Sequence, residues 1–150
     1  ITPFIWYDAD PRDVRDFYAS IFKDLVTVYE MTVSDGPPVG VAVAIAGKPY
    51  VLFNGGPAHP QTNAFSLAVS ADGQDEVDYF WEKLVEGGGA HNVCGWLNDK
   101  YGVAWQIWPS NLSELLGGPD KAASQRVHQA VLGMTKLVVA DLEAAYRGEA

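Results

Sequence analysis

The residues best suited to covalent chemistry are one cysteine and three histidines, and their spacing predicts no catalytic pair. Cys94 follows His91 by three positions, so a thiolate and a base are near each other in sequence. A nucleophilic cysteine also needs a base within hydrogen-bond reach and a third group that orients this base. Sequence proximity shows neither, and we interpret Cys94 as a small buried residue that opens a strand. The other histidines, His59 and His128, fall in an expected linker and an expected tail helix, so no catalytic residue is assigned.

The elements that must position any site are present twice. Residues 14–21 have helical spacing of apolar side chains, and residues 77–84 repeat them. The equivalent apolar residues, each pair 63 positions apart, are Val14 with Val77, Phe17 with Phe80, Tyr18 with Trp81, and Ile21 with Leu84. A repeat of this length indicates one supersecondary unit used twice, with a binding site expected where the two units meet.

The order of the expected elements is strand, helix, strand, strand, strand in both copies. In the first copy we expect strands at 4–7, 25–33, 39–46 and 50–54 and a helix at 11–22. In the second we expect strands at 64–70, 91–93, 95–99 and 103–108 and a helix at 74–86. Further helices are expected at 110–116, 119–132 and 137–146. The fold class is therefore α+β: two tandem βαβββ units, about 1–57 and 64–109, form a curved mixed-sheet cup in a single domain of residues 1–150, with a helical tail at 110–150.

Composition limits the partners and the compartment. The 150 residues are 48% hydrophobic and carry a net charge of −9, which disfavours nucleic acid and anionic membrane. No apolar run reaches the ~20 residues that span a bilayer. A single cysteine gives no internal disulfide and suits a reducing cytoplasm. We expect a cytoplasmic protein with a small-molecule ligand or a protein partner, and no nucleic-acid or membrane partner.

Several local strings resemble one protein family. They are FYASIF on the first helix, and then 1–4 (ITPF), 53–57 (FNGGP), 75–84 (DEVDYFWEKL), 94–107 (CGWLNDKYGVAWQI) and the tail strings at 119–127 and 142–146. Together they resemble the PhnB-like group, labelled 3-demethylubiquinone-9 3-methyltransferase, of the vicinal oxygen chelate superfamily of glyoxalase, bleomycin-resistance and dioxygenase proteins. The resemblance covers essentially the whole chain and implies that the two sheets curl into a cup around a ligand cavity.

The resemblance also implies where a metal would bind, and the residues at those places are poor ligands. Metal-dependent relatives carry His or Glu on the first and last strands of each unit. Here those places hold Pro3, Ala64 or Ser66 depending on register, and Gln106. A divalent ion needs imidazole or carboxylate donors, so we expect neither a metal nor another cofactor. The methyltransferase label gains no support from residues 55–57 or 87–89, because neither glycine cluster joins a strand to a following helix as a nucleotide-binding turn does.

Strand alternation predicts which side chains line the cup. The small, hydroxyl-bearing face of 64–70 and the face of residues 104, 106 and 108 should point inward, and the same logic selects residues 3, 5 and 7 and residues 50, 52 and 54. The candidate ligand-binding residues are Tyr7, Asn54, Ser66, Trp96, Gln106 and Trp108. The amides of Asn54 and Gln106 would orient a flat or partly apolar ligand. The alternative is that these side chains fill the cup as a second core.

Three functions stay open at this point. The first is a PhnB-like small-molecule-binding protein that acts without metal or turnover. The second is an enzyme of the superfamily, a lyase, dioxygenase or methyltransferase-labelled protein, that acts on a small, possibly aromatic substrate through Asn54, Ser66 or Gln106. The third is a structural or regulatory dimeric subunit. A homodimer is expected in each case, because the superfamily commonly pairs its units across chains and the tail carries apolar surface at Val127, Val131, Met134, Leu137 and Tyr146.

Overall fold

The structure is a computed structural model that describes residues 1–149. It contains two compact units, Ile1–Gln61 and Thr62–Ala150. The break between them falls inside the linker expected at 58–63.

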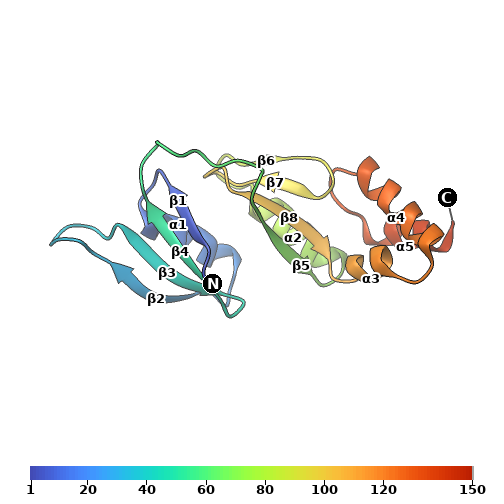
Figure 1. Cartoon of the computed structure of the whole chain (residues 1–150), viewed down its shortest axis with the longest axis horizontal. Helices are drawn as coiled ribbons and strands as arrows, with labels where there is room; N and C mark the ends of the chain where they lie inside the picture. The colour runs from blue at the N-terminus through green and yellow to red at the C-terminus, as the bar shows by residue number, and fades with distance from the viewer. Residues whose placement is uncertain (150) are drawn as a thin grey trace. The chain divides into compact units, whose positions relative to one another are not determined.

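The first unit is a four-stranded sheet with one helix (Figure 1). Its sheet has the order β1-β4-β3-β2, in which β1 runs parallel to β4 and the other neighbours are antiparallel. Helix α1 packs on one face of this sheet, against β3 and β4. The elements are β1 Phe4–Tyr7, α1 Pro11–Ile21, β2 Val26–Met31, β3 Gly40–Ile45 and β4 Lys48–Asn54.

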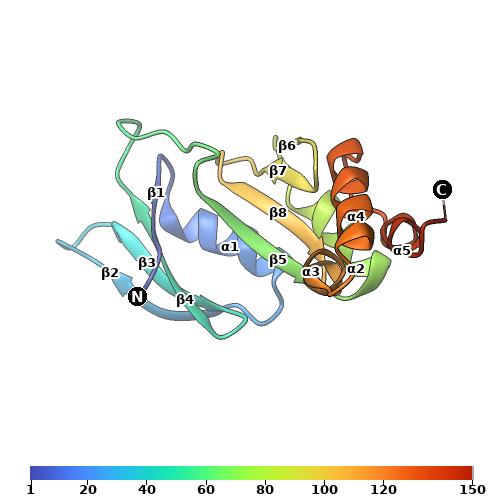
Figure 2. The same cartoon turned by 45° about the vertical axis from the view of Figure 1, so that its right-hand side comes forward.

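The second unit repeats this topology and adds the tail. Its sheet has the order β5-β8-β7-β6, again with the first and last strands parallel, and α2 packs against β5 and β8. Figure 2 shows the three tail helices gathered beyond the end of β8. The elements are β5 Ser66–Ala71, α2 Gly73–Lys83, β6 Ala90–His91, β7 Trp96–Asn98, β8 Ala104–Pro109, α3 Leu112–Gly117, α4 Lys121–Gly133 and α5 Val139–Arg147.

The helix starts follow from local chemistry. Before α1, the Asp10 carboxylate accepts a hydrogen bond from the Arg12 backbone N–H at 2.9 Å, and Pro11 takes the first helical position. Before α4, the Asp120 carboxylate accepts from the amides of Ala122 and Ala123. Both aspartates satisfy amides that have no partner within the helix. Pro11 already has the backbone angle that the first turn requires.

The repeated helix residues form the core beneath each helix. Val14 and Val77 are fully buried, and Tyr18 and Trp81 are 1% and 4% exposed. The 63-residue repeat thus marks the helix face that meets the sheet. The prediction of two βαβββ units with eight strands and a helical tail is confirmed as an α+β fold. Within the described residues, the helices are too short or too polar to cross a bilayer.

Candidate functional site

The second sheet has one face covered by α2, and we call its opposite face helix-free, although the tail meets this face at the end of β8. Ile107 and Leu97 are 0% exposed and belong to the covered face. Gln106 lies between two buried residues of β8, so alternation turns its side chain to the opposite face. There the Gln106 side-chain N–H donates to the Ser66 hydroxyl at 2.8 Å, and Trp96 is its register partner on β7. The structure therefore brings three of the expected residues together on the helix-free face, where all three are half-buried.

Trp108 shares this face of β8 but meets the tail. Its side chain packs against the buried cluster that the tail helices form. This cluster, which we call the tail cluster, consists of Leu112, Val127, Leu137 and Leu142. Trp108 is thus half-covered by residues that follow it in sequence.

The first strand presents the opposite face from the one expected. Tyr7 is 2% exposed, and its hydroxyl lies 3.2 Å from the Tyr18 hydroxyl on α1. Ile5 and Leu52 are buried as well and are register partners on the same face. The expectation that Tyr7 points away from the helix is wrong, because the alternation of this strand is shifted by one residue. Whether any of these side chains contacts a ligand stays a prediction.

Asn54 serves the turn that follows β4. Its side-chain oxygen accepts a hydrogen bond from the Gly56 backbone N–H at 3.2 Å, and the residue is exposed. This is the local bond by which asparagine commonly stabilises a turn. The Asn54 oxygen is therefore already engaged within its own loop.

The helix-free face of the first sheet carries an aromatic cluster that sequence reasoning missed. Phe53 lies between Phe4 and Trp6, with ring centroids 5.2 and 5.4 Å away, and His59 meets Trp6 edge-on at 5.0 Å. Trp6 also donates its indole N–H to the Gly56 carbonyl at 2.8 Å. A Cβ added to Gly55 would lie 1.8 Å from the Trp6 ring, so only glycine fits beneath the indole. We call Phe4, Trp6, Phe53 and His59 the aromatic face.

A small open cavity lies beside Trp96. Its volume is about 250 Å³, and it is lined by Asn63, Asn92, Val93, Cys94 and Trp96. Cys94 is a free, half-buried thiol. His91 is not its base, since the His91 ring stacks on Trp81 at 4.3 Å and its Nε2 lies 2.9 Å from the Trp81 carbonyl oxygen. Cys94 lies half-buried in the turn before β7, so the expectation of a buried residue at the start of a strand is wrong in both respects, and His91 is not placed to activate its thiol.

The residues at the expected metal positions do not fit a divalent cation. Gln106 offers a neutral amide whose N–H faces the Ser66 hydroxyl, and Pro3 has no donor side chain. Such ions prefer carboxylate or imidazole ligands. Within residues 1–149 no group of three or more His, Cys, Asp or Glu side chains is arranged to hold an ion. The residues at the expected positions are therefore not suitable ligands for a divalent metal ion.

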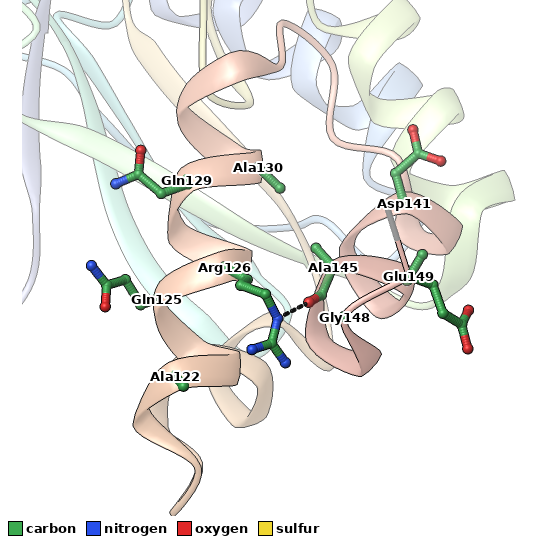
Figure 3. Close-up of a pocket in the computed structure, with 10 residues that line it drawn as sticks. Ala122, Gln125, Arg126, Gln129, Ala130, Asp141, Ala145, Gly148 and Glu149 are labelled. Carbon is green, nitrogen blue, oxygen red and sulfur yellow. Dashed lines mark hydrogen bonds between the residues drawn. The ribbon is translucent and has the colours of Figure 1, made fainter.

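A hollow also lies between two of the tail helices, α4 and α5 (Figure 3). It has a volume of about 820 Å³. The Arg126 side chain bridges the helices by donating to the Ala145 carbonyl at 2.9 Å and to the Tyr146 carbonyl at 2.6 Å. These carbonyls belong to the last turn of α5, where a guanidinium is electrostatically favoured. The lining residues are Ala122, Gln125, Arg126, Gln129, Ala130, Asp141, Ala144, Ala145, Gly148 and Glu149.

Comparison with known proteins identifies the fold and the family. Residues 1–108 match the family described as 3-demethylubiquinone-9 3-methyltransferase. The PhnB protein of Bacillus cereus is 26% identical, with a TM-score of 0.63, and the match covers 73% of this chain and 98% of that one. A protein from Pseudomonas aeruginosa is 18% identical, with a TM-score of 0.59 and coverages of 73% and 96%. No curated protein matches the chain at the significance required.

A third solved structure with the same fold is a resistance protein. The fosfomycin resistance protein FosX of Mesorhizobium loti is 17% identical, with a TM-score of 0.57, and the match covers 78% of this chain and 95% of that one. At this identity the likeness concerns the fold alone. The family match over residues 1–108, together with the paired βαβββ units, places the protein in the vicinal oxygen chelate superfamily. Within it, the chain belongs to the PhnB-like family described as 3-demethylubiquinone-9 3-methyltransferase.

The tail stands apart from this match. The family region ends at residue 108, within β8, so α3, α4 and α5 follow it. The resemblance expected over essentially the whole chain is therefore established for residues 1–108, and the tail helices are known from the structure itself.

Proposed function

We propose that this protein binds a small molecule on the helix-free face of its second sheet, as a PhnB-like binding protein that uses neither metal nor covalent chemistry. The observation that carries the proposal is the hydrogen-bonded pair of Gln106 and Ser66 beside Trp96. An amide and a hydroxyl can each donate and accept, and an indole offers a flat apolar surface. Together they suit a planar ligand that carries a carbonyl or hydroxyl group.

The neutrality of this face supports binding over metal-assisted chemistry. The pair is half-buried, and a charged group at that depth would lose hydration without a partner. Neutral amide and hydroxyl groups orient a ligand without that cost. We assign no residue of this face to the methyl-transfer activity named in the family's description.

The test is a titration with 4-hydroxyacetophenone, a flat ring with one hydroxyl and one carbonyl, followed by calorimetry. We expect saturable binding to the parent and about tenfold weaker binding to Gln106→Leu, since one good hydrogen bond is worth roughly 1 kcal/mol or more. The matched control is Gln125→Leu, on the exposed surface of α4. Equal affinity of the parent and the Gln106→Leu variant would contradict the proposal. Native mass spectrometry of protein purified from cells would reveal the natural ligand.

A homodimer is the second part of this proposal. The apolar tail residues expected at a dimer interface pack in or on the tail cluster of their own chain. They therefore give no reason to expect a dimer interface at the tail. The first sheet gives a different reason to expect a dimer, because Phe4, Val26 and Tyr29 are 58%, 60% and 53% exposed. Exposed apolar surface of this kind commonly marks an interface. Sedimentation at micromolar concentration tests this, and a monomer would count against it.

We also place the protein in the cytoplasm. Cys94 is a free, half-buried thiol, which suits a reducing compartment. Fractionation of cells of the source organism tests this location.

A further inference from the structure

The segment between α4 and α5 is bound to the turn that precedes Trp96. The Cys94 backbone N–H donates to the Met134 carbonyl at 2.7 Å, and the Gly95 N–H donates to the Thr135 carbonyl at 2.8 Å. Leu137, fully buried, packs directly on Gly95: a Cβ at Gly95 would lie 3.0 Å from the Leu137 Cγ. Two backbone hydrogen bonds and one apolar contact thus join this segment to the start of β7.

The same segment is held from its other side by α2. The Gln74 side chain donates to the Leu137 carbonyl at 3.3 Å and accepts from the Val139 N–H at 2.8 Å. The Lys136 ammonium lies 2.7 Å from the Asp78 carboxylate, which also accepts from Gln74 at 2.9 Å. We call residues 134–139 the clamp segment. The Gln74 side chain thus hydrogen-bonds both a backbone donor and a backbone acceptor of the clamp segment.

The turn that the clamp segment holds is conformationally demanding. Cys94 has φ of +59° and Gly95 has φ of +77°, and a non-glycine residue in the left-handed region persists where surrounding contacts fix it. Trp96 follows at once, and its backbone N–H donates back to the Val93 carbonyl at 3.1 Å. The conformation of this turn therefore determines where the Trp96 side chain and the cavity beside it lie.

We propose that the clamp segment positions Trp96 for ligand binding, with Gln74 as the positioning residue that locks the segment onto the second unit. This inference rests on the function proposed above. It assigns a role to a part of the chain that lies beyond the family match of residues 1–108. Gln74 touches no ligand and acts through the clamp segment and the turn.

Hydrogen exchange of single backbone amides tests the proposal without any ligand. The Gln74→Met variant keeps the length of the side chain but loses its hydrogen bonds. We expect the amides of Cys94 and Gly95 to exchange about tenfold faster, because losing the two hydrogen bonds from Gln74 to the clamp segment shifts an opening equilibrium by at least that factor. The Ile107 amide, which donates to the Gly95 carbonyl at 2.8 Å, reports the neighbouring strand and should change less. Gln125→Met is the control and should leave the exchange of both turn amides unchanged.

Two outcomes would overturn the proposal. Unchanged exchange at Cys94 and Gly95 would show that Gln74 does not hold the clamp segment. An equal acceleration at all protected amides would show a general loss of stability instead of a positional role. Where Gln74→Met fails to fold, Lys136→Met removes the Asp78 contact from the half-exposed surface and is read by the same amides.

A second measurement links the clamp segment to binding. Affinity for 4-hydroxyacetophenone should fall about fivefold in Gln74→Met, since a loosened turn no longer fixes the Trp96 side chain. An unchanged affinity beside a loosened turn would overturn the positioning role. A parent protein that does not bind the probe would refute the proposed function, while the exchange data would still decide whether Gln74 locks the segment.

Discussion

The two βαβββ units share one topology and present opposite chemistry on their helix-free faces. The first unit displays the aromatic face, with Phe4 58% exposed. The second displays the amide–hydroxyl pair of Gln106 and Ser66, and its β7 turn and β8 end are contacted by the tail. The repeat therefore conserves the helix-covered side, where Val14 and Val77 are both fully buried. Duplication of a fold leaves the other side of each sheet free to acquire a separate role.

The largest expected effect is a difference in stability between substitutions at two adjacent residues of β8, one on each face of the sheet. Ile107→Ala should lower the free energy of unfolding by about 4 kcal/mol, since it removes a fully buried side chain and leaves a cavity. Gln106→Leu, on the adjacent helix-free position, should change it by less than about 1 kcal/mol. Urea denaturation of both variants checks this. Similar losses in the two would mean that Gln106 is a core amide.

The next effect concerns the close packing in the first unit. Gly55→Ala should cost about 3 kcal/mol, because its Cβ would collide with the Trp6 ring and force the indole to move. The control is Gly56→Ala, where φ is +76° and nothing lies within 4 Å, so backbone strain alone should cost about 1 kcal/mol. Thermal unfolding ranks the two variants. The reverse order would show that the aromatic face is loosely packed.

A smaller effect on stability, with a clear effect on association, is expected at the exposed edge strand. Tyr29→Ser should leave the free energy of unfolding within about 0.5 kcal/mol of the parent and weaken self-association about tenfold. Leu132→Ser on α4, which removes another exposed apolar side chain at 54% exposure, is the comparison. Sedimentation of both variants measures the strength of their self-association. Weaker association of the Leu132 variant alone would move the interface to the tail.

The smallest effect is a pH dependence at the clamp segment. The hydrogen bond from Lys136, with a second from Gln74, lowers the pKa of Asp78 from its ordinary value of 3.8. The folded state therefore binds this proton less tightly than the unfolded state does. The resulting stabilisation is present above pH 3.8 and is lost as the pH falls through the lower folded pKa.

Because Asp78 is 46% exposed, solvent screening limits this contribution to a few tenths of a kcal/mol. Asp78→Asn should flatten the stability profile below about pH 4 by that amount. Denaturation across this range, with Asp75→Asn on the exposed first turn of α2 as control, measures the difference. A steeper profile in the Asp78→Asn variant would contradict the assignment.

The sequence predicts the topology well because the helix residues carry a strong periodic signal. Val14, Tyr18 and Ile21 recur as Val77, Trp81 and Leu84, and all six are buried. The faces of β5 and β8 were also predictable, since small hydroxyl-bearing residues alternate with larger apolar ones. Strand β1 offers no such contrast: the four residues FIWY are all bulky, so nothing in them distinguishes the helix side from the free side.

The contacts of the tail could not be read from the sequence for a different reason. Gln74 meets Leu137 and Val139 through side-chain-to-backbone hydrogen bonds, which leave no periodic pattern in either segment. The aromatic face depends on a glycine that admits the Trp6 ring, and Gly55 alone reads as an ordinary turn residue. Both features combine residues that are far apart in the chain.

The parallel pairing of the first and last strands has a consequence for how each unit folds during synthesis. Phe4 pairs with Val51, and Ser66 pairs with Ala104, so each first strand must await a partner made 47 or 38 residues later. The hairpins β3–β4 and β7–β8 close locally, and local contacts form fastest. The apolar β1 is thus synthesised before its partner strand and docks late, so it stays open to wrong pairing while its unit is incomplete.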